Sequence, residues 1–363
     1  MSTLLFYLPF LLLFALVGAY VERKLAALIQ GRLGPKEVGY RGLGQPLADL
    51  LKLLQKESRV PTAADKVLFV VAPAWIFVVV LAAFAVLPVT HVWHGAPTAT
   101  GALYLLAMAS LEPLGLFVAG WASHNKYARL GAMRALLQCM AYEVPLGLSV
   151  LSVLIVSQTL DLPTIVAQQG PGTPACVSTP TYLLGIKGIE AAQWGGLLTW
   201  NIVRMPPLCL AYILFFVTSL AACHRTPFDL PESESELVGG YHTEYSGVRW
   251  AWLMLSEYSM LLLMSLLGVV LFLGGGHTPL PDLPGLPLGT WTRGLAGTWT
   301  SHGWAGCWLF AKALCIILVQ MSIRWTLPRL RYDQVIRLCW QYLTPAGLLL
   351  CFVTLWWQFL ILG

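Results

Sequence analysis

The chain has 363 residues, of which 57% are hydrophobic and only 11% are charged, and its mean hydropathy is +0.71. A soluble domain carries about 25% charged residues, so these values exclude an ordinary soluble protein and indicate a polytopic membrane protein. The net charge of +5 does not favour nucleic-acid binding, because the basic residues fall between apolar segments, where membrane topology explains them.

Apolar segments long enough to cross a bilayer, which needs about 20 residues, follow one another along the chain. We predict eight spans, at residues 3–22, 67–89, 101–122, 138–159, 195–222, 251–273, 304–325 and 337–360. The first lacks a basic start and a cleavage site, so we expect a retained helix and not a signal peptide. The predicted fold class is all-α, a single membrane domain of about eight transmembrane helices.

Positive charge is confined to one set of connections. The segments 23–66, 123–137, 223–250 and 324–337 hold eighteen of the 22 Lys and Arg residues. Basic residues concentrate in cytoplasmic loops, so we predict that these four connections are cytoplasmic and that both termini lie outside. The outer segments 160–193 and 274–303 are rich in Gly, Pro, Thr and Trp and suggest no chemistry.

The first cytoplasmic connection contains a short amphipathic helix at 45–57. Its leucines at 47, 50, 51 and 54 form one apolar stripe, while Asp49, Lys52 and Lys56 occupy the other face. It is too short to span the membrane, so we expect it to lie in the interface plane. It is either a surface anchor or the border of an opening for a lipid-like substrate.

The third cytoplasmic connection, "HRTPFDLPESESELVGGYHTEYSG" (224–247), concentrates negative charge in a chain that has little. Its five acids are Asp229, Glu232, Glu234, Glu236 and Glu244. Asp229 and Glu232 match a D-x-x-E capping box, so a well-capped helix with a solvated acidic face explains this pair. It does not explain the acids further along the loop.

Three more carboxylates, Glu112, Glu143 and Glu257, fall within or near the ends of apolar spans. A carboxylate at mid-bilayer costs about 2.5–3.5 kcal/mol, so such residues tend to be paired or functional. Arg204 and Lys312 are the expected counter-charges. The alternatives are structural ion pairs or snorkelling to the interface, the latter above all for Glu112.

These patterns predict a membrane protein that conducts protons or couples charge movement, with acids leading inward from the cytoplasmic side. The eight cysteines are scattered, with no C-x-x-C pair and no close Cys/His group, and are expected to pack as small hydrophobes. We predict no metal, haem or iron–sulfur site on this chain.

Six stretches together carry a resemblance to a known family. They are "ERKLAALIQGRLGP", "VGYRGLGQPLADLLKLLQKE", "GWASHNKYARLGAMRALLQCMAYEVP", "WNIVRMPP", "RTPFDLPESESELVGGYHTEYSG" and "IRWTLPRLRYDQVIRLCWQYLTP". In this order the chain resembles the quinone-site membrane subunits of respiratory complex I, the proton-pumping NADH:quinone oxidoreductase. The resemblance runs from residue 21 to about 345.

The resemblance implies a subunit of a multi-pass complex in the bacterial inner membrane. Quinone would be the substrate, entering between the first helix, the in-plane helix and the sixth helix. The partners would be peripheral-arm subunits, which carry FMN and the iron–sulfur clusters, together with small and antiporter-like membrane subunits. This chain would hold no redox centre, and its acids would relay the effect of quinone reduction to proton pumping.

The implied roles fall on three sets of residues. The quinone chamber and its entrance match Arg23, Lys24, Arg32, Gln45, Pro46, Leu47, Asp49, Lys52 and Phe228. The proton relay matches Glu143, Asp229, Glu232, Glu234, Glu236, Glu244 and Glu257. Docking of the peripheral arm matches Arg329, Arg331, Tyr332 and Asp333.

One departure concerns Glu112 and Pro113, which stand in the third span where the family pattern leads us to expect small or apolar residues. Three other functions stay open at this point. The chain could belong to a membrane-bound hydrogenase-like complex, act as a stand-alone proton channel or transporter, or serve only as an anchor for the arm.

Overall fold

The computed structural model describes residues 2–90, 98–170, 195–283, 286–292 and 298–362. Within these ranges the secondary-structure elements are helices joined by irregular connections, apart from one minimal hairpin, so the prediction of an all-helical polytopic membrane protein is confirmed. Six helices are long and apolar enough to cross a membrane: α3 (Lys66–Phe84), α4 (Gly101–Ala122), α5 (Lys126–Ser157), α10 (Val248–Phe272), α12 (Trp299–Thr326) and the continuous helix at Tyr332–Leu360.

Two further apolar helices overlap with predicted spans. α1 covers Ser2–Ile29, and α8 is a shorter apolar helix at Pro206–Ala222. Each of the eight predicted spans therefore contains helix. The fifth is interrupted, with α7 (Asn201–Arg204) separated from α8 at Met205, because Pro206 and Pro207 open a new helix and cannot continue the old one.

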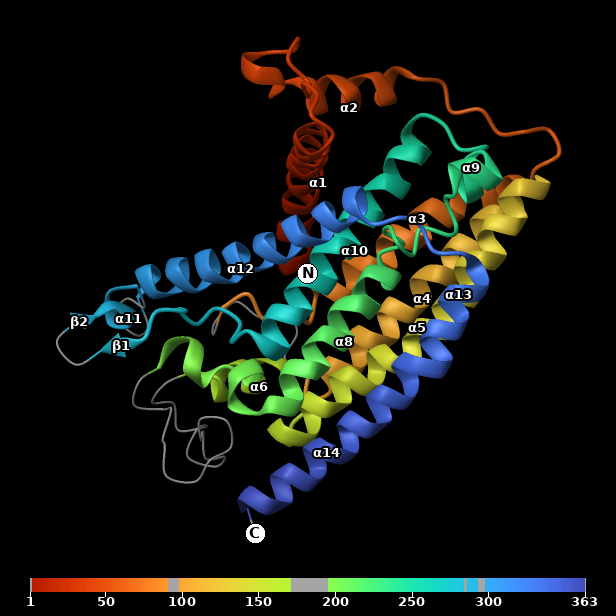
Figure 1. Cartoon of the computed structure of the whole chain (residues 1–363). Coiled ribbons are helices and arrows are strands. Elements are labelled where there is room, and N and C mark those ends of the chain that lie inside the picture. The colour runs from red at the N-terminus through yellow and green to blue at the C-terminus, as the bar shows by residue number, and fades with distance from the viewer. Residues whose placement is uncertain (1, 91–97, 171–194, 284–285, 293–297, 363) are drawn as a thin grey trace.

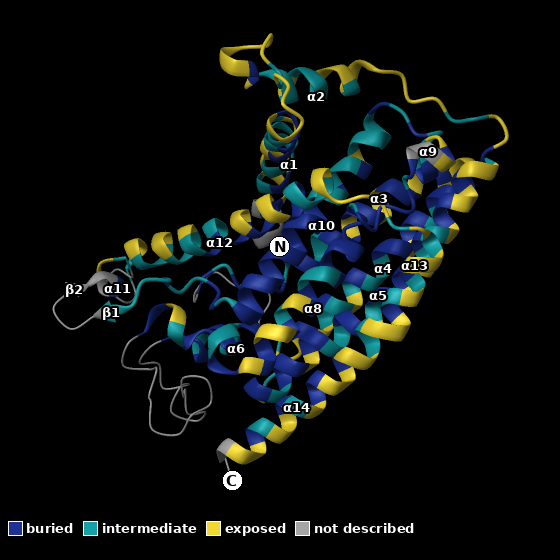
Figure 2. Ribbon diagram, in the orientation of Figure 1, coloured by how far each residue is buried: buried dark blue, intermediate teal, exposed yellow. Residues whose placement is uncertain are grey.

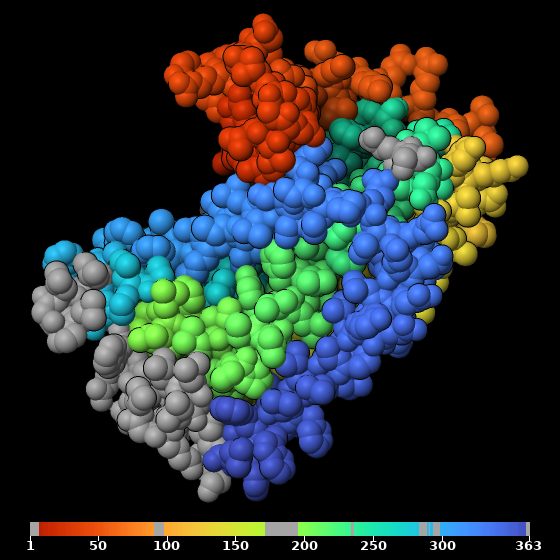
Figure 3. All heavy atoms as spheres, viewed as in Figure 1, coloured from red at the N-terminus to blue at the C-terminus, as the bar shows by residue number. Residues whose placement is uncertain are grey.

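The long helices form a slanted bundle around α10, with α12 crossing its front and α14 running along one edge (Figure 1). α10 contacts α1, α3, α8 and α12, and its C-terminal half is buried on all sides, as the dark ribbon in Figure 2 shows. In the space-filling view, α12 and α14 form the near surface of the bundle (Figure 3). A helix whose C-terminal half is buried on every side belongs at the centre of such a bundle.

The amphipathic helix α2 (Gln45–Gln55) lies at one end of the bundle, beyond α1, and none of its residues is buried (Figures 1 and 2). Its leucine stripe remains exposed, with Leu47 56% exposed. An exposed apolar stripe on a short helix fits the interface plane of a bilayer, as the sequence predicts. The loop at 223–247, with the one-turn helix α9 (Glu234–Leu237), lies at the same end.

The remaining elements are short, except for α14, which forms most of the continuous helix at Tyr332–Leu360. They are α6 (Leu162–Gln168), α11 (Leu288–Trp291), α13 (Tyr332–Arg337), a π-helical segment (Leu338–Leu343), α14 (Thr344–Leu362), and 3₁₀ turns at Tyr40–Gly42, Gly196–Thr199 and Gly240–His242. The strands β1 (Asp282–Leu283) and β2 (Leu286–Pro287) pair antiparallel, with Leu283 opposite Leu286.

Candidate functional site

The acidic loop folds back onto α10 and places one of its carboxylates beside Glu257. Tyr241, which is fully buried, donates a 2.8 Å hydrogen bond to Glu257 Oε1, and its hydroxyl lies 3.4 Å from Glu232 Oε1. His242 Nε2 is 3.8 Å from the same Glu232 oxygen. We call Glu232, Tyr241, His242 and Glu257 the loop cluster.

The loop cluster holds two carboxyls that interact with each other. Burial, and then the charge of Glu257, raise the pKa of Glu232 well above its usual range. Two interacting carboxyls release their protons as a coupled pair. The phenol of Tyr241 reaches both carboxyls, and the guanidinium of Arg225 interacts electrostatically with both.

The same geometry brings three potential metal ligands together. The donor atoms of Glu232, His242 and Glu257 lie within 4.8 Å of one another. Two carboxylates and an imidazole are ligands that suit a divalent transition metal. The Tyr241 phenol and the positive charge of Arg225 also interact with both carboxyls.

A second network surrounds Glu22 on α1, a residue that sequence reasoning did not single out. Its buried carboxylate accepts a 2.8 Å hydrogen bond from Arg225 Nη1, one of 2.8 Å from the Tyr258 hydroxyl, and an ion pair from Arg324. Arg225 also stacks on the Tyr258 ring at 5.0 Å. One carboxylate thus joins α1, the loop, α10 and α12. The motif "ERK" at the end of the first span was the available signal.

Glu112 lies inside the bundle, contrary to the expectation that it reaches the outer surface. Glu112 is 2% exposed, and its Oε2 has no hydrogen-bond partner among the described residues. It lies within electrostatic range of Glu257 on one side and of Cys139 and Tyr142 on the other. Glu112 is therefore a buried carboxylate that interacts electrostatically both with the loop cluster and with residues next to Glu143.

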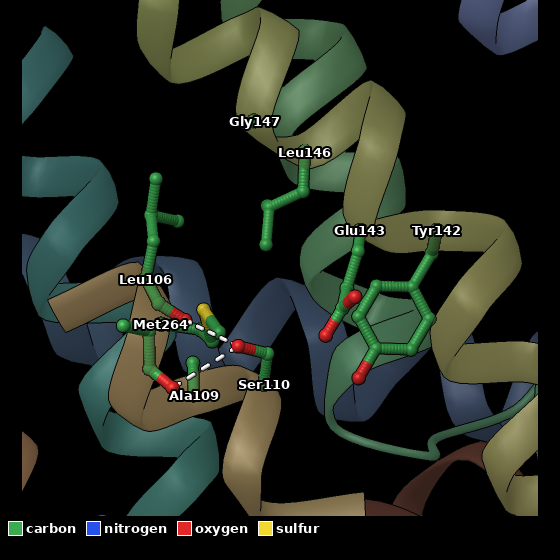
Figure 4. Close-up of a pocket in the computed structure, with 9 residues that line it drawn as sticks. Leu106, Ala109, Ser110, Tyr142, Glu143, Leu146, Gly147 and Met264 are labelled. Atoms are coloured by element: carbon green, nitrogen blue, oxygen red, sulfur yellow. Dashed lines mark hydrogen bonds between the residues drawn. The ribbon is translucent and has the colours of Figure 1, made fainter. Parts of the chain in front are cut away.

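Glu143 lies at a half-open cavity of about 190 Å³ between α4 and α5. Cys139 donates a 3.0 Å hydrogen bond to Glu143 Oε1. Figure 4 shows the side chains of Glu143 and Tyr142 directed toward Ser110, whose hydroxyl donates to the Leu106 carbonyl at 3.2 Å. The carboxylate of Glu143 therefore borders a cavity between two helices of the bundle.

Three other loop acids have their hydrogen-bond partners outside the loop cluster. Asp229 pairs with Arg329 at 2.8 Å, Glu236 with Arg134 at 2.5 Å, and Glu244 accepts a 2.7 Å hydrogen bond from Asn125. The side chain of Glu234 lies outside the described residues. These contacts tie the loop to α5 and to the last connection.

The predicted capping box at Asp229 and Glu232 is wrong. Residues 229–233 are not helical, and α9 begins only at Glu234, after Ser233. Asp229 instead accepts a hydrogen bond from Arg329, and Glu232 lies against the hydroxyl of Tyr241. Strong tertiary partners outcompete a local cap because each supplies a charge-assisted or buried hydrogen bond.

The residues predicted for the chamber and its entrance lie mostly on or near α2. Arg23 forms an ion pair with Asp49, whose other oxygen accepts a 3.0 Å hydrogen bond from Gln45, and Lys24 donates to the Pro35 carbonyl at 2.7 Å. Pro46 stands in the first turn of α2. Arg32, Leu47 and Lys52 are exposed. Phe228, by contrast, is buried in the main hydrophobic core.

The connection between α12 and α13, predicted to dock the peripheral arm, is accessible. Arg331 and Asp333 are exposed, Tyr332 is half-buried at the start of α13, and Arg329 is the residue held by Asp229.

Lys312 is not a counter-charge for the intramembrane acids, contrary to the sequence prediction. Its Nζ donates to the carbonyls of Leu273, Gly275 and His277 at 2.7–2.8 Å and lies 4.1 Å from the centre of the Trp200 ring. It therefore satisfies carbonyls beyond the C-terminal end of α10, where a cation also suits the helix dipole. Arg204 is buried in α7.

Comparison with known proteins agrees with these features. A family model described as NADH dehydrogenase matches residues 1–355. An NADH-quinone oxidoreductase H subunit of Cytophaga hutchinsonii is 46% identical, over 98% of each chain. The H subunit of Chlorobaculum tepidum is 42% identical over 96% of this chain and 90% of its own, and that of Geobacillus kaustophilus is 39% identical over 94% and 88%. The chain therefore belongs to the family of NADH-quinone oxidoreductase H subunits, which are multi-pass membrane subunits of respiratory complex I.

Proposed function

We propose that this chain couples quinone reduction to proton translocation, with the loop cluster as the first proton-holding group of the relay. The observation that carries the proposal is the pair Glu232 and Glu257, bridged by the Tyr241 phenol where the acidic loop meets α10. A pair that shares one proton responds to a nearby change of charge by taking up or releasing it. Reduction of quinone to quinol supplies such a change.

From the loop cluster the proposed path runs inward through Glu112 to Glu143. Glu112 interacts electrostatically with Glu257 and with Cys139, and Cys139 donates to Glu143. The cavity at Glu143 would pass the proton or its charge to a neighbouring membrane subunit. Carboxylates that are buried and incompletely paired are suited to this task because small changes nearby shift their protonation.

Quinone entrance is proposed between α1, α2 and α10. This rests on the family resemblance and on the exposed leucine stripe of α2, which offers an apolar surface at the interface plane. Arg23, Lys24, Arg32, Gln45, Pro46, Leu47, Asp49 and Lys52 would line it. Phe228 would instead support the floor of the site, because its ring packs among the helices.

The partners of the chain within the complex are proposed on the same basis. The exposed Arg331 and Asp333 would dock the peripheral arm, with Tyr332 and Arg329, on the cytoplasmic side. FMN and the iron–sulfur clusters would belong to that arm. The predominance of basic residues in the four loops supports a bacterial inner-membrane topology with both termini in the periplasm.

The test is Glu143→Gln in the assembled complex, studied in inside-out membrane vesicles. We expect NADH-driven quinone reduction and proton uptake to fall together, on the order of 10²-fold, because a buried proton carrier is lost. NADH oxidation with a water-soluble artificial acceptor should stay unchanged, since it bypasses the quinone site. Glu57→Gln, at an exposed carboxylate paired with Arg59, is the matched control. Full proton pumping by an assembled Glu143→Gln complex would overturn the proposal.

A further inference from the structure

His224 is a buried titratable residue for which the path described above has no use. It follows Cys223 at the end of α8, and its backbone N–H bonds to the Ala221 carbonyl at 3.2 Å. Its φ of 49° is in the left-handed region, which is uncommon for residues other than glycine. This conformation ends the helix and turns the chain toward the bundle interior, where the residue is only 5% exposed.

Neither ring nitrogen of His224 has a hydrogen-bond partner among the described residues. A neutral imidazole offers one donor and one acceptor, and a buried polar atom without a hydrogen-bond partner is destabilising. Burial lowers the pKa of His224 to about 4, although Glu257 acts in the opposite direction, so the ring is neutral at physiological pH. A neutral imidazole whose two nitrogens lack hydrogen-bond partners among the described residues suits proton transfer, in which one nitrogen accepts a proton while the other donates one.

The surroundings of His224 contain other incompletely paired polar atoms. Gln138 on α5 donates to the Ala221 carbonyl at 2.9 Å, and its Oε1 has no partner among the described residues. Cys223, the neighbour of His224, lies within electrostatic range of both Glu112 and Glu257. The end of α8 is therefore where the loop cluster and the intramembrane acids approach each other. Buried polar atoms of this kind ordinarily form hydrogen bonds with internal water.

We propose that His224 carries the proton between Glu257 and Glu112, through water bound at its two ring nitrogens. A proton arrives at one nitrogen, the proton on the other leaves, and rotation of the ring then restores the starting arrangement of donor and acceptor, so no charge is left on the ring. This inference rests on the proposed function, because it assigns the step between two acids of that path. It makes His224 a relay residue that acts between carboxyls and does not contact quinone.

The experiment is chemical rescue of His224→Gly in the whole complex in native membranes. Glycine accepts the left-handed φ without strain, so the turn is kept and a space of imidazole size is opened. We expect NADH-driven quinone reduction to fall roughly tenfold or more, with the artificial-acceptor rate unchanged. Added imidazole should restore the rate. N-methylimidazole, which can accept a proton but has no N–H to give, should not. His302→Gly, on α12 away from these acids, controls for added imidazole.

Two results would overturn the inference. One is a normal coupled rate in His224→Gly, and the other is equal rescue by N-methylimidazole, which would show that the ring only fills space. Either result combined with an inactive Glu143→Gln complex leaves the proposed function standing. A fully pumping Glu143→Gln complex would instead sink the proposed function itself, so the two failures are distinguishable.

Discussion

The phenol of Tyr241 donates a 2.8 Å hydrogen bond to Glu257, joining the acidic loop to the central helix of the bundle. Tyr241 belongs to the 3₁₀ turn at Gly240–His242, while Glu257 lies in the first half of α10. Gly240 has a φ of 59°, and a Cβ there would collide with the Pro231 carbonyl oxygen. The close approach of the turn to Pro231 is therefore possible only with glycine, and it sets the Tyr241 side chain between Glu232 and Glu257.

This bond makes Tyr241→Phe a sharp test of the loop cluster. Removing the hydroxyl deprives Glu257 of a donor worth about 1.5–3 kcal/mol to a charged group, so we expect quinone reduction to slow about tenfold in an assembled complex. Tyr245→Phe is the control, because its hydroxyl bonds to backbone carbonyls at 3.3 and 3.4 Å and to no acid of the loop cluster. Equal rates in the two variants would contradict a role of the phenol beyond packing.

Glu232 predicts a dependence of stability on pH. Its pKa is raised by burial and by Glu257, so folding favours the protonated carboxyl. That contribution is fully present below the pKa of the unfolded chain and is lost as the pH rises through the higher folded value. Glu232→Gln mimics the protonated form and cannot ionise. As the pH rises above the ordinary range of a carboxyl pKa, the wild-type complex should therefore lose thermal stability more steeply than the variant, as followed by retention of the chain on native gels after heating. Parallel curves would contradict the assignment.

Composition and hydrophobic pattern were sufficient to predict the fold class, because the lengths of the apolar segments and the positions of the basic loops can be read directly from the sequence. The site was less predictable. The loop acids look equivalent in sequence, yet Glu232 reaches Glu257, while Glu236 pairs with Arg134 and Glu244 contacts Asn125. The turn at Gly240 decides which acid points into the bundle. This turn depends on tertiary contacts, so the spacing of residues in the sequence does not predict it.

Two misplaced charges show the same limit. Glu112 was expected at the surface, but α4 presents it to the bundle, and helix periodicity is uninformative where both faces are apolar. Lys312 was expected to neutralise an acid, but it lies near the end of α10 opposite to the loop cluster. Opposite charges in spans pair only when they lie at the same depth, and depth depends on how the helices are staggered.

Glu112 itself is open to a direct test. Glu112→Gln removes the carboxyl that interacts with both Glu257 and Cys139. We expect an assembled complex in which quinone reduction and proton uptake fall together, by roughly tenfold or more, measured in inside-out vesicles. Glu57→Gln again serves as the exposed control. Unchanged proton uptake per NADH at an unchanged rate would remove Glu112 from the path.

Glu22 is predicted to matter for assembly more than for proton transfer. Its carboxylate accepts from Arg225 and Arg324, and both the Glu22 and Arg225 side chains are less than 10% exposed. Glu22→Gln leaves buried guanidinium charge uncompensated, and breaking a buried pair in this way costs about 3–5 kcal/mol. We expect a marked loss of this chain from the complex, measured by native gels and immunoblotting.

The double variant Glu22→Gln with Arg225→Met discriminates this electrostatic account from simple packing. Removing the buried cation together with the carboxylate should recover assembly relative to Glu22→Gln alone, because replacing both members of a buried pair is often near neutral. Quinone reduction should nevertheless stay low in the double variant, because Arg225 also interacts with Glu232 and Glu257. If the double variant assembles no better than the single one, Glu22 acts through its shape and its bond to Tyr258, and the charge balance around it is not what holds α1, α10 and α12 together.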